Sequence, residues 1–190
     1  FSMSPFDKAR YERLLQGLEA SETPFSLAVA QERFDAGSFS RVSQQLRERL
    51  ESLHSVPLES LADVSDGNHL SIASEFSESV GVRYLRGQDI SGEMVLEDRS
   101  AVFIPEVEYG MLSRSHIFEN DVLVTIVGAN TGYTALVFGS QERLTANCKL
   151  GILRVRKDRA VSAAYLHAFL AGRYGQLQID GKIRGGGQTG

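Results

Sequence analysis

The residues of this chain best suited to chemistry are cations, amides and hydroxyl groups that lie close to glycines. They are Asn68, His69, Arg83, Tyr84, Arg86, Gln88, Asn130, Thr131, Lys149, Lys182, Arg184 and Gln188. Guanidinium forks and side-chain amides can hydrogen-bond the edges of bases, and cations and backbone N–H groups can bind phosphates. These residue types favour recognition through hydrogen bonds and charge.

Two of the segments that carry them read as exposed loops. Asn68 and His69 follow a flexible glycine, and Asn130 and Thr131 lie between two glycines, where backbone N–H groups could approach a phosphate. A turn or strand-end amide often hydrogen-bonds its own backbone. For Asn130 and Asn147 this structural interpretation is favoured over ligand contact.

The other segments bring arginine and lysine. Residues 83–88 alternate in and around a predicted strand, which would place Arg86 and Gln88 on one face if the strand continues. Arg83, Arg86 and Arg184 are equally open to a contact role and to an ordinary surface role. Lys149 and the segment 182–188 supply a basic C-terminal approach.

Charge is distributed unevenly along the 190 residues. The net charge of −4 argues at first against a nucleic-acid partner. Residues 61–140 carry 4 basic and 12 acidic groups, whereas residues 141–190 carry 9 basic and 3 acidic groups. Arginine outnumbers lysine 16 to 4, and its planar fork suits phosphates and guanine edges. The C-terminal third is therefore a basic segment on an acidic chain.

The familiar sequence motifs of enzymes are not found. There is no G-x-x-x-x-G-K-[ST] phosphate loop, G-x-S-x-G elbow or H-E-x-x-H pair. The four histidines lack metal-ligand spacing, and the single Cys148 excludes an internal disulfide and a cysteine-rich zinc site. Asp180-Gly181-Lys182 is similar to one end of a metal-dependent nuclease site, but no paired upstream acid supports it. We expect no catalytic residue, metal or cofactor.

Hydrophobic runs are short. The longest, residues 122–127, is far below the ~18 residues that span a bilayer, and no secretory segment is evident at the N-terminus. A cytoplasmic location with no membrane partner is therefore expected.

The pattern predicts an α+β fold in which residues 1–56 are helical. Tyr11, Leu14, Leu15 and Leu18 recur at helical spacing, and a second helix is predicted from near residues 35–38 to Pro57. The apolar stripe of this second helix is narrow, so it should pack on another helix or another chain.

Residues 57–190 form the second predicted domain, which is rich in strands. Strands are predicted over residues 82–85, 94–96, 102–104, 122–127, 133–138 and 149–155, with a helical turn over 105–112. Ser162 is a suitable N-cap for a helix over residues 163–173. The end of the chain is too rich in glycine for regular structure.

Several blocks of this second domain are recognisable in a fixed order. The clearest is residues 119–133, an Asn-Asp pair, a hydrophobic strand and a glycine-bracketed turn ending at Tyr133. The others are residues 58–69, 81–92, 147–154, 165–170 and the ending Gly-Gly-Gly-Gln at 185–188. Together they resemble the target recognition domain of specificity (S) subunits of Type I restriction–modification enzymes. Residues 11–19 and 33–36 are similar to leaders of some specificity subunits, although Gly37-Ser38 departs from that pattern.

The resemblance implies a non-enzymatic subunit that binds double-stranded DNA and reads one half of a bipartite target. Its partners would be methylation (M) subunits and, through them, restriction (R) subunits. The other half of the target would be read by a second copy in a homodimer or by a second recognition domain. On this hypothesis the twelve residues named first contact DNA, with Arg86 reading a base and Lys182 binding a phosphate.

Two other functions remain open from the sequence. One is a protein-interaction adaptor whose N-terminal helices dock a partner without base readout, which the negative middle zone favours. The other is a catalytic fragment of a restriction enzyme.

Overall fold

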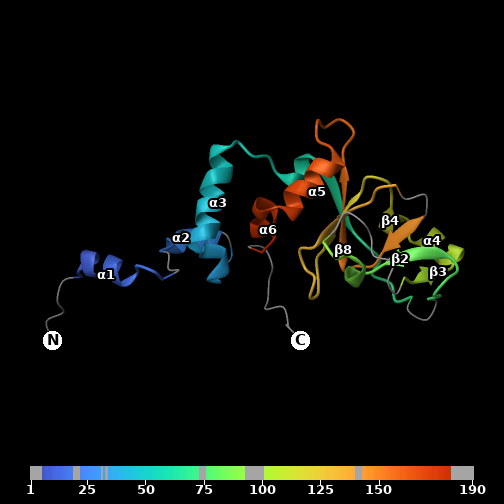
Figure 1. Ribbon diagram of the computed structural model, residues 1–190, viewed down its shortest axis with the longest axis horizontal. Coiled ribbons are helices and arrows are strands. Elements are labelled where there is room, and N and C mark those ends of the chain that lie inside the picture. Colours follow the sequence, from blue (N-terminus) through green and yellow to red (C-terminus); the bar gives the residue numbers. More distant parts are fainter. Residues whose placement is uncertain are drawn as a thin grey trace. The chain divides into compact units, whose positions relative to one another are not determined.

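The computed structural model describes residues 6–18, 22–30, 32, 34–72, 76–92, 101–139 and 143–180. The chain separates into two compact units, one helical and extending to Ser55, the other rich in strands and beginning at Val56. Figure 1 shows the elements of both units, coloured in order along the sequence. Helices occur with two sheets made mainly of antiparallel pairs, so the predicted α+β class is confirmed.

Short helices make up the first unit. They are α1 (Lys8–Leu14), α2 (Phe25–Ala30), the 3₁₀ turn η1 (Gly37–Phe39) and α3 (Arg41–Ser52). Asp7 caps α1 by accepting from the Arg10 N–H at 2.9 Å, and Ser40 caps α3 by accepting from the Ser43 N–H at 3.2 Å. The two predicted helices correspond to α1 and α3, whereas α2 was not predicted because its six residues are too few for a helical period.

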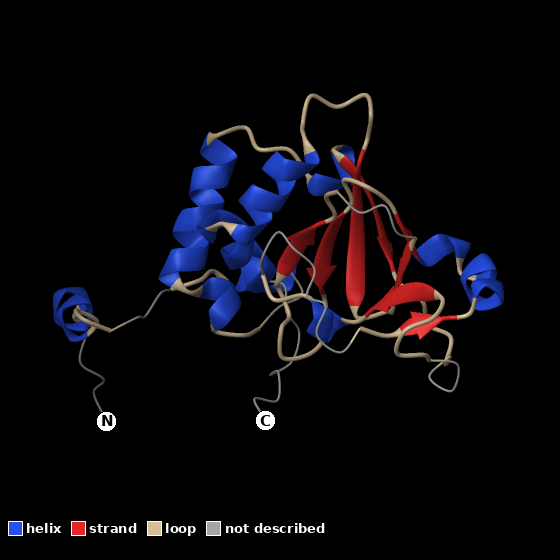
Figure 2. Cartoon of the chain, turned by 45° about the vertical axis from the view of Figure 1, so that its right-hand side comes forward, coloured by secondary structure: helices blue, strands red, loops and turns tan. Residues whose placement is uncertain are grey.

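Two four-stranded sheets form the second unit (Figure 2). The first sheet has the order β1 (Ala62–Asp66), β8 (Leu150–Val155), β5 (Val122–Thr125) and β6 (Thr134–Leu136), all antiparallel. The second has the order β3 (Phe103–Ile104), β2 (Val82–Leu85), β7 (Leu144–Ala146) and β4 (His116–Ile117), in which β2 and β7 are parallel.

The main core involves both sheets, because alternate residues of each strand project to the same face. Leu123 of β5 and Ile152 of β8 belong to one buried cluster with Leu85 of β2 and Leu144 of β7. Val122, one residue earlier on β5, belongs instead to the cluster that includes the buried residues of α5 (Ala163–Ala171). The first sheet is therefore covered on both faces, which makes it a rigid support for the loops at its ends.

The remaining elements precede, connect or follow the strands. They are η2 (Leu58–Ser60), η4 (Gly87–Asp89), α4 (Glu106–Met111), η5 (Ser113–Ser115) and α6 (Arg173–Asp180). Ser162 caps α5 as predicted, accepting from the Tyr165 N–H at 3.1 Å. The helix stops at Ala171, earlier than predicted, because Gly172 is extended and separates it from α6. The predicted strand at 94–96 lies outside the described residues.

Candidate nucleic-acid interface

Four chain segments meet at one end of the two sheets. They follow the C-terminal ends of β1, β2, β5 and β7 and comprise residues 66–70, 86–90, 126–133 and 146–149, here called the loop cluster. The strand registers bring them together, since Asp66 pairs with Gly151, Thr125 with Leu150, and Leu85 with Ala146. Segments far apart in the sequence thus share one surface.

Backbone hydrogen bonds join the segments directly. The Asn68 N–H donates to the Ala146 carbonyl at 2.6 Å, and the Cys148 N–H donates to the Asn68 carbonyl at 2.9 Å. The Ile126 N–H donates to the Lys149 carbonyl at 2.8 Å. These bonds fix the loops to one another, so a side chain on one segment is held in register with side chains on the next.

Two glycines allow this close approach. A Cβ at Gly67 would lie 2.1 Å from the Asn147 carbonyl oxygen, a distance that no side chain tolerates. A Cβ at Gly87 would lie 3.3 Å from Thr125 Cγ2 and 3.4 Å from Lys149 Cβ. Gly87 therefore packs directly against the base of the Lys149 side chain.

Gln88 and Lys149 are the exposed members of the predicted set on this packed pair of segments. With the residues that the structure describes, Gln88 makes no side-chain hydrogen bond and Lys149 no ion pair. Gln88, whose amide can both donate and accept, thus directly follows the glycine that packs against the base of the Lys149 side chain. Such a pair can bind a base edge and a phosphate.

At the end of β1, two basic side chains converge on one carboxylate. Arg114 Nη2 donates to Asp66 Oδ1 at 2.5 Å, and His69 Nε2 lies 2.6 Å from Asp66 Oδ2. The hydrogen bond from His69, with the charge of Arg114, lowers the pKa of Asp66 below its usual 3.8. Arg114 could not be predicted as a site residue from the sequence, because it lies on the 3₁₀ turn η5, 48 residues from Asp66.

Three predicted contact residues are buried instead. Asn68 is 8% exposed, Arg83 8% and Tyr84 4%. The Asn68 amide is bonded to both backbone groups of Leu70, at 2.8 Å and 3.0 Å, and burial raises the pKa of the Tyr84 hydroxyl. Burial of these three side chains does not favour direct contact with DNA, and their predicted contact roles stay predictions.

Arg86 also differs from the prediction. Its strand ends at Leu85, so Arg86 and Gln88 do not lie on one strand face. Arg86 Nε and Nη2 donate to the Asp89 carboxylate at 3.1 Å and 3.0 Å, and the Arg86 N–H donates to it at 2.8 Å. The guanidinium therefore holds the η4 turn that carries Gln88, and base reading by Arg86 is not supported.

The two polar residues of the 126–133 turn bond backbone groups. Asn130 Nδ2 donates to the Ile90 carbonyl at 3.2 Å, and Thr131 Oγ1 donates to the Gly128 carbonyl at 2.6 Å. For Asn130 this is the structural interpretation that the sequence favoured. The turn is also tied to α6, because Gln176 Nε2 donates to the Gly132 carbonyl at 2.9 Å. Lys182, Arg184 and Gln188 lie outside the described residues.

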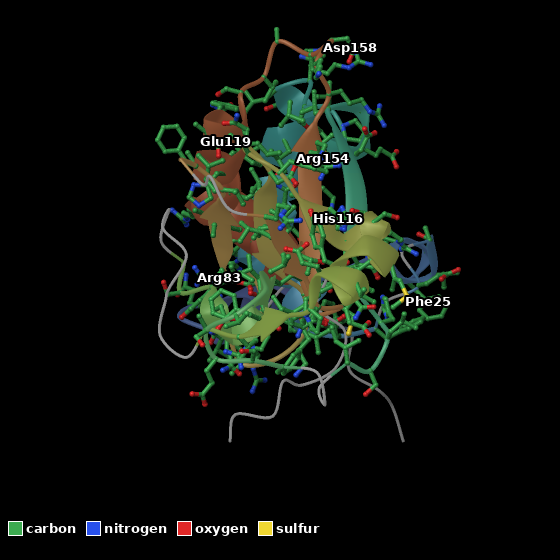
Figure 3. All side chains as sticks on the ribbon, turned by 90° about the vertical axis from the view of Figure 1, so that its right-hand side faces the viewer. Phe25, Arg83, His116, Glu119, Arg154 and Asp158 are labelled. Atoms are coloured by element: carbon green, nitrogen blue, oxygen red, sulfur yellow. The ribbon has the colours of Figure 1, made fainter. Side chains whose placement is uncertain are left out.

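The Asn-Asp pair of the clearest sequence block has a structural role. Asp121 is buried and accepts from Arg154 Nε at 2.8 Å and Nη2 at 2.7 Å, and from the Phe118 N–H at 2.8 Å. Arg154, labelled in Figure 3, also donates to the carbonyl of His116 at 3.1 Å. The Asp121–Arg154 ion pair joins the start of β5 to the end of β8, away from the loop cluster.

Among the described residues, no group of three or more histidine, cysteine, aspartate or glutamate side chains is arranged to hold a metal ion. The described helices are all too short or too polar to cross a membrane.

Two solved structures are similar to this chain. One is the HsdS subunit from Thermoanaerobacter tengcongensis, with 16% identity, a TM-score of 0.49, and coverage of 67% of this chain and 28% of that one. The other is a structure that describes complex assembly and conformational transition of the type I R-M system. It has 17% identity, a TM-score of 0.44, and coverage of 85% of this chain and 38% of that one.

Both structures belong to the type I restriction–modification system, the family that the sequence blocks resemble. The chain spans well under half the length of either protein. No family model and no curated protein matches the chain.

Proposed function

We propose that this chain recognises a short sequence in double-stranded DNA through the loop cluster, as a non-catalytic specificity module. The observation that carries the proposal is that two exposed polar side chains, Gln88 and Lys149, come from segments that pack against each other at Gly87, on a unit whose first sheet is covered on both faces. Base readout needs donors and acceptors whose positions are fixed before binding, and this arrangement supplies them.

The loop cluster offers three kinds of contact that a DNA groove can use. Gln88 supplies an amide, which can form a bidentate pair with adenine. Lys149 supplies a phosphate contact. Ile126 and Val127, which are 44% and 56% exposed beside Lys149, supply apolar contact of the kind that recognises a thymine methyl.

The finer parts of the proposal rest on the sequence resemblance. The chain would read one half of a bipartite target, and a second copy or another recognition domain would read the other half. Methylation subunits and, through them, restriction subunits would supply the chemistry. Because the net charge is −4, phosphate contacts are few and the isolated chain should bind DNA weakly.

Protein interaction is the second candidate function, and the helical unit favours it. In α1 no residue is buried, and in α3 only Leu46 is. Phe25 and Phe34, with ring centroids 6.0 Å apart, are 74% and 72% exposed. A unit with so much exposed apolar surface is suited to docking another subunit, which is compatible with DNA recognition by the loop cluster.

The test compares two variants of the loop cluster with matched controls in the full chain. Lys149→Ala should weaken binding to all duplexes about equally and lower the salt slope by about 1, and Gln88→Ala should cost ~1–3 kcal/mol and relax preference at one position. Lys157→Ala, beyond the other end of β8, and Gln178→Ala, on α6, remove the same groups elsewhere on the unit and should change neither.

Fluorescence anisotropy with labelled duplexes measures both effects over a range of salt concentrations. The proposal is contradicted if the loop-cluster variants and the controls bind alike.

A further inference from the structure

The Asp66 carboxylate bonds two exposed basic side chains. Arg114 and His69 each bond a different oxygen of this carboxylate, at 2.5 Å and 2.6 Å, and their side chains are 76% and 63% exposed. The carboxylate itself is 29% exposed and lies at the end of β1, within the loop cluster. A guanidinium and an imidazole are thus held around one carboxylate within the proposed DNA surface.

The chemistry of this arrangement is that of a phosphate site. A phosphate, like a carboxylate, offers several oxygens in a fork that arginine can bond, and charge-assisted bonds to either anion have similar lengths. Exposed ion pairs contribute little net stability, because water screens them and long side chains lose entropy. An incoming phosphate could therefore take both basic side chains from Asp66 without a large loss of stability.

The other exposed ion pair of β1 lies farther from the loop cluster than the Asp66 carboxylate does. Asp63 pairs with Arg156 through a 2.8 Å bond, but Asp63 lies three residues earlier on β1, about 10 Å from Asp66. It pairs in register with Arg154, near the end of β8 farthest from Lys149. Asp66, by contrast, adjoins Gly67 and Asn68, whose N–H groups donate to the carbonyls of Leu150 and Ala146, on either side of Lys149 in the sequence.

We infer that Arg114 and His69 form a backbone-phosphate subsite for DNA, and that Asp66 is its resident counter-ion, which a phosphate displaces on binding. The inference rests on the proposed function and extends it by two side chains and a competitor. Asp66 keeps both basic side chains in position before binding and lowers the affinity for every sequence equally, since a phosphate carries no sequence information.

Asp66→Asn keeps the shape of the side chain and removes the competing charge. It should tighten binding to duplexes of any sequence by about three- to tenfold, the range expected when weak surface pairs no longer compete. Arg114→Ala should weaken binding and lower the salt slope by about 0.9, the value for one lost phosphate contact. In the double variant, most of the gain from Asp66→Asn should disappear.

Asp63→Asn and Arg156→Ala are the matched controls, because they change the same charges on the same strand and its partner. Circular dichroism checks that each variant is folded, and anisotropy measures binding to two unrelated duplexes. A gain for Asp66→Asn that Asp63→Asn does not reproduce supports the subsite.

Equal effects of the Asp66 and Asp63 variants overturn the inference while the wild-type chain still binds DNA. Loss of sequence preference only, with no change in salt slope for Arg114→Ala, also overturns it. Failure of both the wild type and Asp66→Asn to bind any duplex would instead overturn the proposed function, and the inference with it.

Discussion

Substitution of Gly67 by alanine should separate the segments of the loop cluster. Gly67 has no positive φ, so alanine can adopt its backbone angles. The obstacle is space, because the added Cβ would lie 2.1 Å from the Asn147 carbonyl oxygen and 2.5 Å from that of Ala146. Both atoms are backbone, so relief requires segment 66–70 to move away from segment 146–149.

That movement breaks three backbone hydrogen bonds. They are Gly67 N–H to Leu150 at 3.1 Å, Asn68 N–H to Ala146 at 2.6 Å and Cys148 N–H to Asn68 at 2.9 Å. At about 1 kcal/mol net for each bond the loss is ~3 kcal/mol. The smaller conformational entropy of an unfolded alanine returns ~0.4–1 kcal/mol. The free energy of unfolding should therefore fall by ~2–3 kcal/mol.

Urea unfolding followed by far-ultraviolet circular dichroism measures this change, and hydrogen exchange at the Asn68 and Cys148 amides locates it. Gly110→Ala is the control, because Gly110 lies in α4 with no atom near its Cβ position. That variant should gain up to ~1 kcal/mol from helix propensity. If Gly67→Ala changes stability by less than ~0.5 kcal/mol and leaves both amides protected, the packing argument is wrong.

Three further predictions concern single side chains. Asp121→Asn keeps the shape of a buried carboxylate but removes the charge that Arg154 bonds. The free energy of unfolding in urea should therefore fall by ~1.5–3 kcal/mol, and an unchanged midpoint would contradict the role of the Asp121–Arg154 pair. The carboxyl of Asp66 should titrate below pH 3.8 by NMR, and its contribution to stability, complete above pH 3.8, should disappear as the pH falls through the lowered pKa. His69→Ala should return that pKa toward 3.8, and a midpoint that does not move would refute the hydrogen bond as the main cause. Ser162→Ala should cost ~1 kcal/mol by removing the cap of α5, and an equal stability would show that the cap is redundant.

The fold was predictable where the sequence carries a clear local signal. Strands β2, β5 and β8 and helix α5 are continuous apolar or periodic segments, and each was found within a few residues. Strands β4 and β7 have two and three residues, and their pairing depends on partners distant in sequence. Such strands have no period to detect, so they were missed.

The candidate site was predictable as a set of loops but not as a set of side chains. Glycine punctuation located the segments 66–70, 86–90 and 126–133, and the structure brings them together. The direction of each side chain depends on where its strand ends, as at Leu85, where Arg86 turns toward Asp89. Arg114 came from a segment with no motif and reaches the site through the tertiary fold alone.

The most direct test of DNA recognition is the selection of bound duplexes from a random-sequence pool. The selection is run with the full chain alone and with a cognate methylation subunit. Recognition of DNA through the loop cluster predicts enrichment of one short motif. Gln88→Ala should lose the base preference at a single position of that motif, and the Gln178→Ala control should retain it. A pool that stays unenriched under both conditions would contradict it.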